Sequence, residues 1–394
     1  MRGKQIAIVA KGSGISYSFD ATNTKCYYMA KTLKSYGLNV AILSSTYYQQ
    51  EPITKKVGRY GDVKYYMPCV HRKSTSRVKR LYLRFKYILK VVGFLVYLKK
   101  KWTRVHFIFD DNSIPFPFLL LLSWIGVIEL IFNLEEWPLA KNIPYPKRLL
   151  SHLFIIFAFK TCRKLVCVSS YLIAQAEHFN KKAKVFKLPA LTKFNQSKCD
   201  LEIDASNQDE IIRFLYCGNV GYSEVIFAIL HAYENISGLK NDQMLELILI
   251  LHGNTLQLQE ISDYVRHSEY PIKIKTSLSE FDLFEEYSQA SVLLAPLRLT
   301  VQDEARFPQK IAEYTALSKP IITTNVGDIG LYFQLEASAI ISENFSVEEL
   351  AKAMNFVINH RQELEKIGLA GNVVGKKYFD YTQYVAKFAD FVTS

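Results

Sequence analysis

The sequence predicts an α/β protein of two doubly wound domains, each with a parallel sheet covered by helices on both faces. Its 394 residues suggest two domains, at roughly 150 residues per domain. Continuous apolar runs, which are typical of buried parallel strands, alternate with helical patterns in both halves of the chain. A polar stretch over residues 190–210 interrupts this alternation and is the predicted linker.

The first half contains six apolar runs that we expect to form strands, at 5–10, 39–43, 105–109, 127–132, 164–168 and 184–188. Helical patterns cover 22–36, 146–160 and 170–179. The stretch 114–132 has the hydropathy of a membrane span, but two prolines, Gly126 and Glu129 interrupt it. A buried helix over 114–125 and a strand over 127–132 therefore explain it better than a continuous span.

The second half repeats the pattern. The expected strands are 213–218, 245–253, 272–276, 291–296, 320–324 and 338–342. The expected helices are 223–236, 255–266, 280–289 and 308–318, and residues 346–394 have a helical pattern throughout. Folds of this class bind their ligands beyond the C-terminal ends of the strands, so we look for functional residues there.

The N-terminal apolar run and the cysteines indicate the cellular compartment in which we expect the protein. The run before Lys11 is too short for the core of a signal peptide. The six cysteines contain no CxxC pair and are scattered along the chain, at Cys26, Cys69, Cys162, Cys167, Cys199 and Cys217. This pattern favours free thiols in a reducing compartment and argues against a metal site.

A glycine pair follows the first predicted strand. Gly12 and Gly14 match the first two glycines of the dinucleotide fingerprint, but Tyr17 occupies the third position. A lone GxG is a weak signal, so binding of NAD is disfavoured. The pair either lets the backbone approach a phosphate or an acceptor, or forms a tight turn with no further role.

The stretch "RFPQKIAEY" at 306–314 combines charges with a predicted helix start. Pro308 suits the first turn of a helix, and a helix N-terminus attracts anions such as a diphosphate. Arg306 and Lys310 add positive charge there, while the carboxylate of Glu313 could accept hydrogen bonds from both hydroxyls of a ribose. The alternative is a surface Lys–Glu pair on a capped helix.

The wider context resembles a known family. "RFPQKIAEYTALSKPIITTNVGDIG" (306–330) resembles the C-terminal-domain signature of retaining, family 4-like glycosyltransferases of the GT-B fold. Other segments that resemble this family, in the same order, are "KLVCVSSYL" (164–172), "KLPA" (187–190), "FLYCGNVGYSEVIFAILHAY" (214–233) and "SVLLAPLR" (291–298).

The resemblance implies a domain layout. We expect two Rossmann-like domains facing across a cleft, an acceptor-side domain over 1–195 and a donor-binding domain over 210–376. The helix 377–394 is expected to pack back on the first domain. Tyr384, Phe388 and Phe391 share one helical face that this packing would bury.

The resemblance also implies a donor site. It assigns donor binding to Gly218, in the turn facing the donor, and to Asn219, Arg298, Arg306, Lys310 and Glu313. The sequence departs from the family at several positions. Ala305 stands where a first glutamate is common, the segment after Gly218 lacks the usual Arg–Lys pair, and Ser318 replaces a common glycine. Arg298, Arg306 and Lys310 are the residues that could supply the missing positive charge.

Glu135 and Glu136 follow the strand 127–132, where many relatives have a histidine. One of them could orient an acceptor hydroxyl or act as a base, so they are the candidate catalytic residues. The alternative is a solvated acidic pair in a loop.

The positive charge of the chain is concentrated in one segment. Between Val63 and Phe109 there are thirteen Lys and Arg and no Asp or Glu, whereas the whole chain carries a net charge of +12. The apolar density within 77–101 favours an anionic lipid surface over nucleic acid as the partner, with Lys99, Lys100 and Lys101 at that surface. The alternative is a core helix with solvated charged ends.

These observations predict a cytoplasmic glycosyltransferase, peripheral at the inner face of the membrane. It would transfer a sugar from a nucleoside diphosphate sugar to a glycan or lipid-linked acceptor in cell-surface polysaccharide synthesis, with retention of configuration. We expect no cofactor and no metal, since a helix dipole and basic side chains can hold the leaving diphosphate. The alternative is a non-catalytic, glycosyltransferase-like subunit that supports a partner enzyme.

Overall fold

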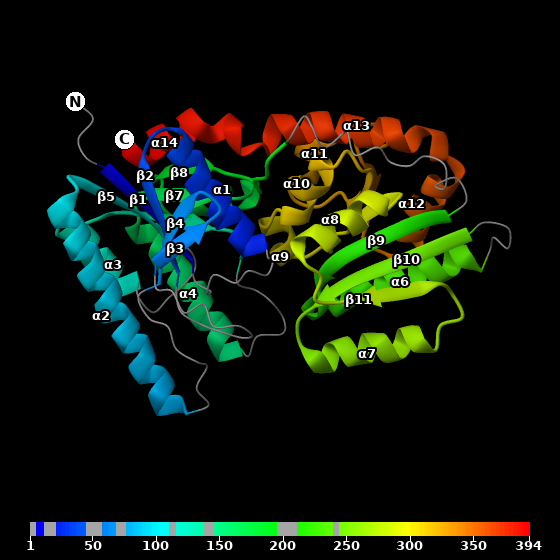
Figure 1. Cartoon of the computed structure of the whole chain (residues 1–394), viewed down its shortest axis with the longest axis horizontal. Helices are drawn as coiled ribbons and strands as arrows, with labels where there is room; N and C mark the ends of the chain where they lie inside the picture. The colour runs from blue at the N-terminus through cyan, green and yellow to red at the C-terminus, as the bar shows by residue number, and fades with distance from the viewer. Residues whose placement is uncertain are drawn as a thin grey trace. The chain divides into compact units, whose positions relative to one another are not determined.

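The computed structural model describes residues 5–11, 21–44, 57–67, 76–109, 116–137, 145–194, 211–238 and 244–394. The chain forms two compact units. The first comprises Met1–Leu191 together with Tyr381–Ser394, and the second comprises Thr192–Asp380. Each unit is built on one sheet flanked by helices, which confirms the predicted doubly wound α/β class (Figure 1).

The sheet of the first unit has eight strands in the order β3-β4-β2-β1-β5-β6-β7-β8. They are β1 (Gln5–Lys11), β2 (Asn39–Ser44), β3 (Val57–Tyr60), β4 (Val63–Tyr66), β5 (Arg104–Phe109), β6 (Glu129–Leu134), β7 (Lys164–Cys167) and β8 (Lys184–Lys187). All pairs are parallel except the β3–β4 hairpin. The six predicted strands are present, and the hairpin is an addition that the sequence analysis did not anticipate.

Helices cover both faces of this sheet. They are α1 (Ala21–Ser35), α2 (Arg77–Lys101), α3 (Phe116–Trp124), α4 (Tyr145–Thr161), α5 (Ser170–Phe179) and α14 (Val385–Thr393). Neighbouring residues of a strand point to opposite faces. Ile131 accordingly belongs to the apolar cluster of α1 and α14, whereas Phe132 packs against Phe116 of α3 and Phe154 of α4. Phe94 of α2 stacks on Tyr66, so α2 lies on the same face as α3 and α4.

The apolar stretch 114–132 forms a helix and a strand, as the sequence predicts. Helix α3 ends at Trp124 and β6 begins at Glu129, after a turn in which Gly126 has a φ of 73°. A positive φ is accessible to glycine without the steric cost of a Cβ, which explains why the apolar run breaks there. Among the described residues, no helix is long and apolar enough to cross a membrane.

Helix α14 packs on the first unit through the predicted aromatic face. Phe186 of β8 contacts Phe388 and Phe391 with ring centroids 5.5 and 5.2 Å apart, and it also contacts Tyr384. Phe388 is fully buried. Burial of a phenylalanine side chain contributes about 1.5–3 kcal/mol, so this face alone holds α14 firmly on the sheet.

A buried lysine holds the C-terminal end of α14. Lys164 Nζ donates to the carbonyl oxygens of Val392, at 3.0 Å, and Ser394, at 2.8 Å. The same ammonium lies 2.8 Å from a carboxylate oxygen of Glu129, whose other oxygen lies 2.9 Å from His106 Nδ1. A cation at a helix C-terminus is stabilising because it satisfies carbonyl groups that have no partner within the helix.

This arrangement predicts a pH dependence. Partial burial acts to raise the pKa of Glu129, but His106 and Lys164 outweigh that effect and lower the pKa to about 2. A lowered pKa contributes stability that is present above the unfolded value and is lost as the pH falls, here from about 4.5 towards 2. The Glu129→Gln variant should lack this contribution, so its denaturant midpoint should fall less than the parent's over that range. Parallel midpoint curves for the two proteins would contradict the assignment.

The second unit has a six-stranded, all-parallel sheet in the order β11-β10-β9-β12-β13-β14. Its strands are β9 (Ile211–Asn219), β10 (Met244–His252), β11 (Ile272–Lys275), β12 (Val292–Ala295), β13 (Ile321–Thr324) and β14 (Ile340–Ser342). All six were predicted. Its helices are α6 (Ser223–Ser237), α7 (Thr255–Arg266), α8 (Glu280–Gln289), α9 (Val301–Ala305), α10 (Gln309–Ala316), α11 (Ile329–Tyr332), α12 (Val347–Asn359) and α13 (Arg361–Tyr378).

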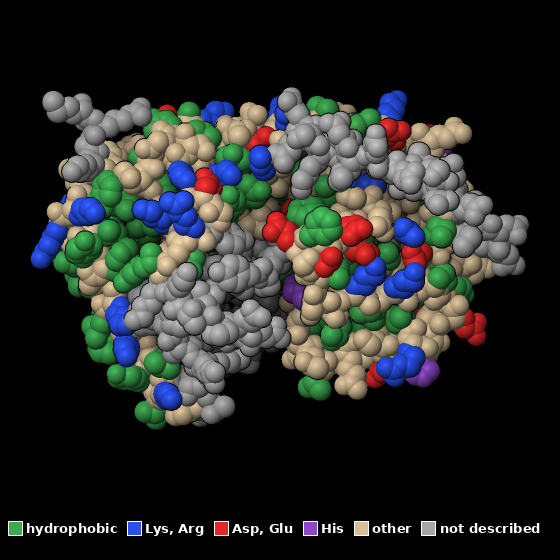
Figure 2. All heavy atoms as spheres, viewed as in Figure 1, with side chains coloured by type: hydrophobic (Ala, Val, Ile, Leu, Met, Phe, Trp, Pro, Cys, Tyr) green, Lys and Arg blue, Asp and Glu red, His purple; other side chains and the backbone are tan. Residues whose placement is uncertain are grey.

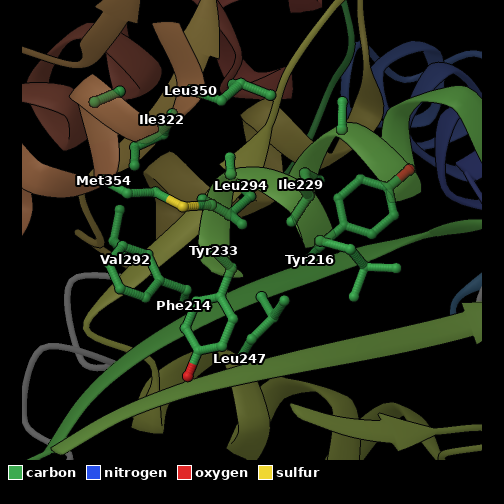
Figure 3. Close-up of a cluster of buried hydrophobic side chains, with 14 of the residues drawn as sticks. Phe214, Tyr216, Ile229, Tyr233, Leu247, Val292, Leu294, Ile322, Leu350 and Met354 are labelled. Carbon is green, nitrogen blue, oxygen red and sulfur yellow. The ribbon is translucent and has the colours of Figure 1, made fainter. Parts of the chain in front are cut away.

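The core of the second unit lies between the sheet and helices α6 and α12 (Figure 3). Phe214 from β9 packs against Tyr233 of α6, with ring centroids 6.2 Å apart, and Met354 of α12 belongs to the same cluster. This packing fixes β9 and β12 in the middle of the sheet. The predicted donor-binding residues lie at the end of β9 and in the segment from the end of β12 to α10, so they stand on a rigid support.

Candidate functional site

The site in the second unit is built around the start of α10. Pro308 is the N-cap of this helix, with φ −64° and ψ 128°, so the helix begins one residue later than predicted. The fixed φ of proline suits this position, and its missing N–H removes one donor that the helix would leave without a partner. Arg306 lies two residues before this N-cap, and Lys310 lies in the first turn of the helix.

Lys310 and Glu313 are not a solvated surface pair. The Glu313 side chain is only 2% exposed, and its Oε2 lies 3.6 Å from Lys310 Nζ. Glu313 Oε2 accepts no hydrogen bond from any residue that the structure describes. Lys310 Nζ donates instead to the hydroxyl of Tyr287, at 2.7 Å. The pair therefore presents a buried carboxylate oxygen with spare acceptor capacity beside a fixed ammonium group.

Lys310 and Glu313 each shift the pKa of the other. Burial raises the pKa of the Glu313 carboxyl above its usual value, and the nearby Lys310 offsets part of this rise. Burial acts to lower the pKa of the Lys310 ammonium, but Cys217 and Glu313 outweigh it and raise that pKa. Lys310 is therefore held in its charged form, ready to contact an anion, and a ligand that donates hydrogen bonds to Glu313 would favour the ionised carboxylate.

A buried aspartate organises two arginines close to this helix start. Asp303, which is fully buried, lies 2.8 Å from Arg298 Nε and 2.9 Å from Arg306 Nε. It also accepts from the backbone N–H of Arg298 at 2.9 Å. Both guanidinium groups lie over the ring of Tyr222, with Cζ 5.3 Å from its centroid for Arg298 and 4.3 Å for Arg306. Cation–π contact and ion pairing together hold the two arginines in place.

The cluster of Asp303, Arg298, Arg306 and Tyr222 lies where the sequence departs from the family pattern. Ala305 is buried and Glu304 is exposed, whereas Asp303 two positions earlier is the acid that turns inward. Tyr222 lies four residues after Gly218, in the segment that lacks the common Arg–Lys pair. The guanidinium groups of Arg298 and Arg306, which come from later in the chain, lie over its ring. Sequence analysis missed Asp303 and Tyr222 because their roles depend on tertiary contacts.

Gly218 and Asn219 lie at the end of β9. The resemblance placed Gly218 in the turn after the strand, whereas the structure places it within β9. Residues two apart share a face of a strand, and a Cβ on Gly218 would lie 2.3 Å from the hydroxyl oxygen of Tyr216. Glycine is therefore required to make room for Tyr216. The Asn219 side chain accepts from the N–H of Gly221 at 2.8 Å and so caps the short helix Val220–Tyr222.

The first unit places Glu135 directly after β6, at the C-terminal edge of its sheet. Asn133 Nδ2 donates to Glu135 Oε1 at 3.0 Å, and Lys25 Nζ of α1 lies 3.3 Å from the same oxygen. Lys25 is almost fully buried, and its ammonium makes no hydrogen bond with a described residue. Glu136 is exposed. Glu135 is thus held by neighbouring polar groups, and Lys25 is a partner that the sequence analysis missed.

The remaining predicted residues lie apart from these clusters or outside the description. Gly12 and Gly14 lie outside the described residues. Lys99, Lys100 and Lys101 are exposed in the last turn of α2. Within the described ranges, no group of three or more His, Cys, Asp or Glu side chains is arranged to hold a metal ion. The described cysteines, Cys26, Cys162, Cys167 and Cys217, are buried free thiols.

Comparison with known proteins gives one family match. Residues 212–360, which make up most of the second unit, match the family described as "Glycosyl transferases group 1". The match includes every predicted donor-binding residue from Gly218 to Glu313. No curated protein matches the chain.

Solved structures match the whole chain in fold. Sucrose-phosphate synthase from Thermosynechococcus elongatus has 12% sequence identity and a TM-score of 0.75, and the match covers 99% of this chain and 98% of that chain. Anabaena Alr3699/HepE in complex with UDP-glucose has 12% identity and a TM-score of 0.68, with coverages of 98% and 99%. An α,α-trehalose-phosphate synthase (UDP-forming) from Burkholderia xenovorans in complex with glucose-6-phosphate has 12% identity and a TM-score of 0.70, with coverages of 99% and 100%.

Proposed function

We propose that the chain is a glycosyltransferase of the GT-B fold that uses a nucleotide sugar, and that its second unit binds the donor at the start of α10. The observation that carries this proposal is the buried Glu313 oxygen that lacks a hydrogen-bond donor, beside the Lys310 ammonium. A ribose offers two adjacent hydroxyl donors to such a carboxylate, and a diphosphate suits the neighbouring positive charge. Similar proteins of this fold include one solved in complex with UDP-glucose, which supports a sugar nucleotide as the donor class.

The basic residues around the N-terminus of α10 are the proposed binding groups for the diphosphate. Arg298, Arg306 and Lys310 supply full charges, and the first N–H groups of α10 supply partial charges. Since Asp303 and Tyr222 already hold the two arginines, these need little reorganisation as negative charge develops on the leaving group. We propose that these groups stabilise the departing nucleoside diphosphate without a metal ion or other cofactor.

The first unit is the proposed binding site for the acceptor. Glu135 is the proposed group that orients or deprotonates the acceptor hydroxyl, Glu136 is the second candidate, and Lys25 holds Glu135 in position. Gly12 and Gly14 remain candidates for backbone contact with a phosphate or with the acceptor. The proposed acceptor is a glycan or a lipid-linked sugar in cell-surface polysaccharide synthesis, with retention of configuration. The proposed location is the cytoplasmic surface of the membrane.

The Glu313→Ala variant tests the donor site. Loss of hydrogen bonds to a charged group should weaken nucleoside diphosphate binding by about 1.5–3 kcal/mol. Calorimetric titration with a panel of nucleoside diphosphates measures this directly. Glu349→Ala is the matched control, because Glu349 pairs with Lys352 at the same three-residue spacing on the outer side of α12, where Lys352 is 74% exposed. Equal affinity in parent and Glu313→Ala would refute the assignment.

A second candidate is a non-catalytic subunit that binds a nucleotide sugar and supports a partner enzyme. Ala305 favours it, because this buried alanine stands where the family commonly has an acid. Release of nucleoside diphosphate from a panel of sugar nucleotides by the purified protein distinguishes the two. Turnover supports the enzyme, whereas tight binding without turnover supports the subunit.

A further inference from the structure

Three neighbouring helices of the first unit expose a continuous series of large apolar side chains. On α2 they are Val78, Leu81, Tyr82, Phe85, Leu89, Val96 and Tyr97. On α3 and the residue after it they are Phe118, Leu121, Trp124 and Ile125, and on α4 they are Leu149, Leu150, Leu153 and Phe157. Single exposed apolar residues are common on protein surfaces, but a set of this size on adjacent helices marks an interaction surface.

The exposed residues of α2 form a stripe that is separate from its buried face. Val78, Leu81, Phe85, Leu89 and Val96 are spaced by three, four, four and seven residues, which places them along one side of the helix. The residues that face the sheet are Ile88, Val91, Leu95 and Leu98, and they form a second stripe. Helix α2 therefore has an apolar side beyond the one its own core requires, so packing within the unit does not explain it.

The three helices lie side by side on one face of the sheet. Phe94 places α2 on the face that also carries α3 and α4, and α2 contacts α3 directly. Phe116 of α3 contacts both Phe154 and Phe157 of α4, with ring centroids 5.0 and 5.9 Å apart. Their outer sides thus form one layer, which we name the α2–α4 face.

The charge of this face has a single sign. The sequences of α2, α3 and α4 contain no Asp or Glu, whereas α2 has nine Lys and Arg and α4 has three. Lys79, Lys86 and Lys90 follow at spacings of seven and four, along one edge of the apolar stripe of α2. Figure 2 shows Lys and Arg side chains interspersed with hydrophobic ones over α2.

We propose that the α2–α4 face inserts into an anionic lipid bilayer. Apolar side chains flanked by lysines match an interface in which acyl chains lie beside negatively charged headgroups. A second copy of this chain is a poor occupant, because two faces of the same positive sign would repel. Since no described helix could cross a membrane, the helices lie in the plane of the interface.

The face also bears on the acceptor. Helices α2 and α4 begin at the C-terminal edge of the first sheet, where Glu135 lies, because each follows a strand and runs back along the sheet. Leu81 and Leu150 lie in these first turns. The bilayer would then adjoin the edge that carries Glu135, which favours the lipid-linked class of acceptor. This last step rests on the proposed function, whereas lipid insertion does not.

Vesicle binding by glutamine variants tests the proposal. Leu81, Trp124 and Leu150 take one residue from each helix and are 70%, 70% and 66% exposed, so Leu81→Gln, Trp124→Gln and Leu150→Gln should not affect folding. Each change should weaken co-sedimentation with phosphatidylcholine–phosphatidylglycerol vesicles about tenfold, and the triple variant more than about a hundredfold. Leu256→Gln and Phe281→Gln are the matched controls, because both residues are 77% exposed but lie on the second unit, and they should bind as the parent does.

Two further measurements separate insertion from charge attraction. Replacing Lys99, Lys100 and Lys101 with glutamine should weaken binding at low salt, and the difference should disappear at about 0.5 M salt because screening removes the electrostatic part. In a Trp102→Phe background, brominated lipids should quench the fluorescence on vesicles. Most of this quenching should be lost when Trp124→Phe is added, since the remaining tryptophan, Trp137, is buried.

The proposal fails if the parent does not bind these vesicles, or if the triple variant binds as tightly as the parent. It also fails if self-association of the parent, measured by sedimentation velocity, is what the triple variant loses. Nucleoside diphosphate binding by the triple variant should equal that of the parent. If neither protein binds a nucleoside diphosphate, the donor-site proposal fails while the vesicle result still decides the α2–α4 face.

Discussion

Replacing Asp303 with asparagine should destabilise the second unit by roughly 3 kcal/mol. Removing one partner of a buried ion pair leaves the opposite charge without compensation, which costs about 3–5 kcal/mol. Here two guanidinium groups lose their buried counter-charge, and both are largely shielded from water, with Arg298 13% and Arg306 20% exposed. Arg298 keeps a weaker partner in Glu224, whose side chain is 67% exposed. The lower end of the range applies because the residual exposure of the two arginines lets water solvate part of the charge. Denaturant unfolding of parent and variant at neutral pH measures the difference.

The second unit supplies a control for this experiment. Asp263 and Arg266 have the same three-residue spacing and a similar distance of 3.1 Å, but their side chains are 46% and 72% exposed. Exposed pairs contribute about 0–1 kcal/mol, so Asp263→Asn should change the unfolding free energy little. If both variants lose the same amount, burial of Asp303 is not what makes its ion pairs important.

Replacing Lys310 with methionine should lower the turnover number about a hundred- to a thousandfold. This is the range for removing one preorganised group that stabilises negative charge in a transition state. Methionine keeps the length and apolar volume of the lysine stem, so packing against Tyr287 should persist. Turnover is measured as nucleoside diphosphate release from the sugar nucleotide that the protein uses.

The pH dependence of nucleotide affinity gives this prediction a second readout. The Lys310 charge holds down the pKa of Glu313, which burial raises. Without Lys310 that pKa should rise further, so the pH above which nucleotide binds well should move upwards. Lys352→Met is the control, because this lysine is 74% exposed and pairs with Glu349 on another helix, α12. An unchanged turnover number and pH profile in Lys310→Met would remove Lys310 from the site.

The sheets could be predicted from sequence because their strands are continuous apolar runs bounded by helical patterns. Residues 245–253 illustrate this: "LELILILHG" is mostly apolar, and it forms most of strand β10. The hairpin β3–β4 was not predicted because its strands have four residues each and contain Arg59, Lys64 and three tyrosines. Such short, mixed segments have no periodicity that distinguishes a strand from a loop.

The candidate site was predictable only in part. Family resemblance located Lys310 and Glu313, whose spacing alone favoured a surface pair. It could not indicate that Glu313 is buried, because burial depends on helices distant in sequence. Asp303, Tyr222 and Lys25 carry no motif, and their partners lie on other elements. Ser318 shows the reverse case, since its φ of 57° is the left-handed conformation that explains a glycine in relatives.

Because α14 belongs to the first unit, that unit cannot be completed until the end of the chain has been synthesised. Tyr36 Oη donates to Asp390 Oδ1 across 354 residues of sequence, and Phe388, Ala389 and Val392 belong to the same apolar cluster as Ala7 and Val9. A ribosome makes residues 381–394 only after the entire second unit. The nascent first unit must therefore wait with one side of its sheet only partly covered, by α1, while the second unit is translated and begins to fold. During that interval its exposed strand residues are open to wrong partners, so cells that make this protein quickly would need chaperones to guard that side of the sheet.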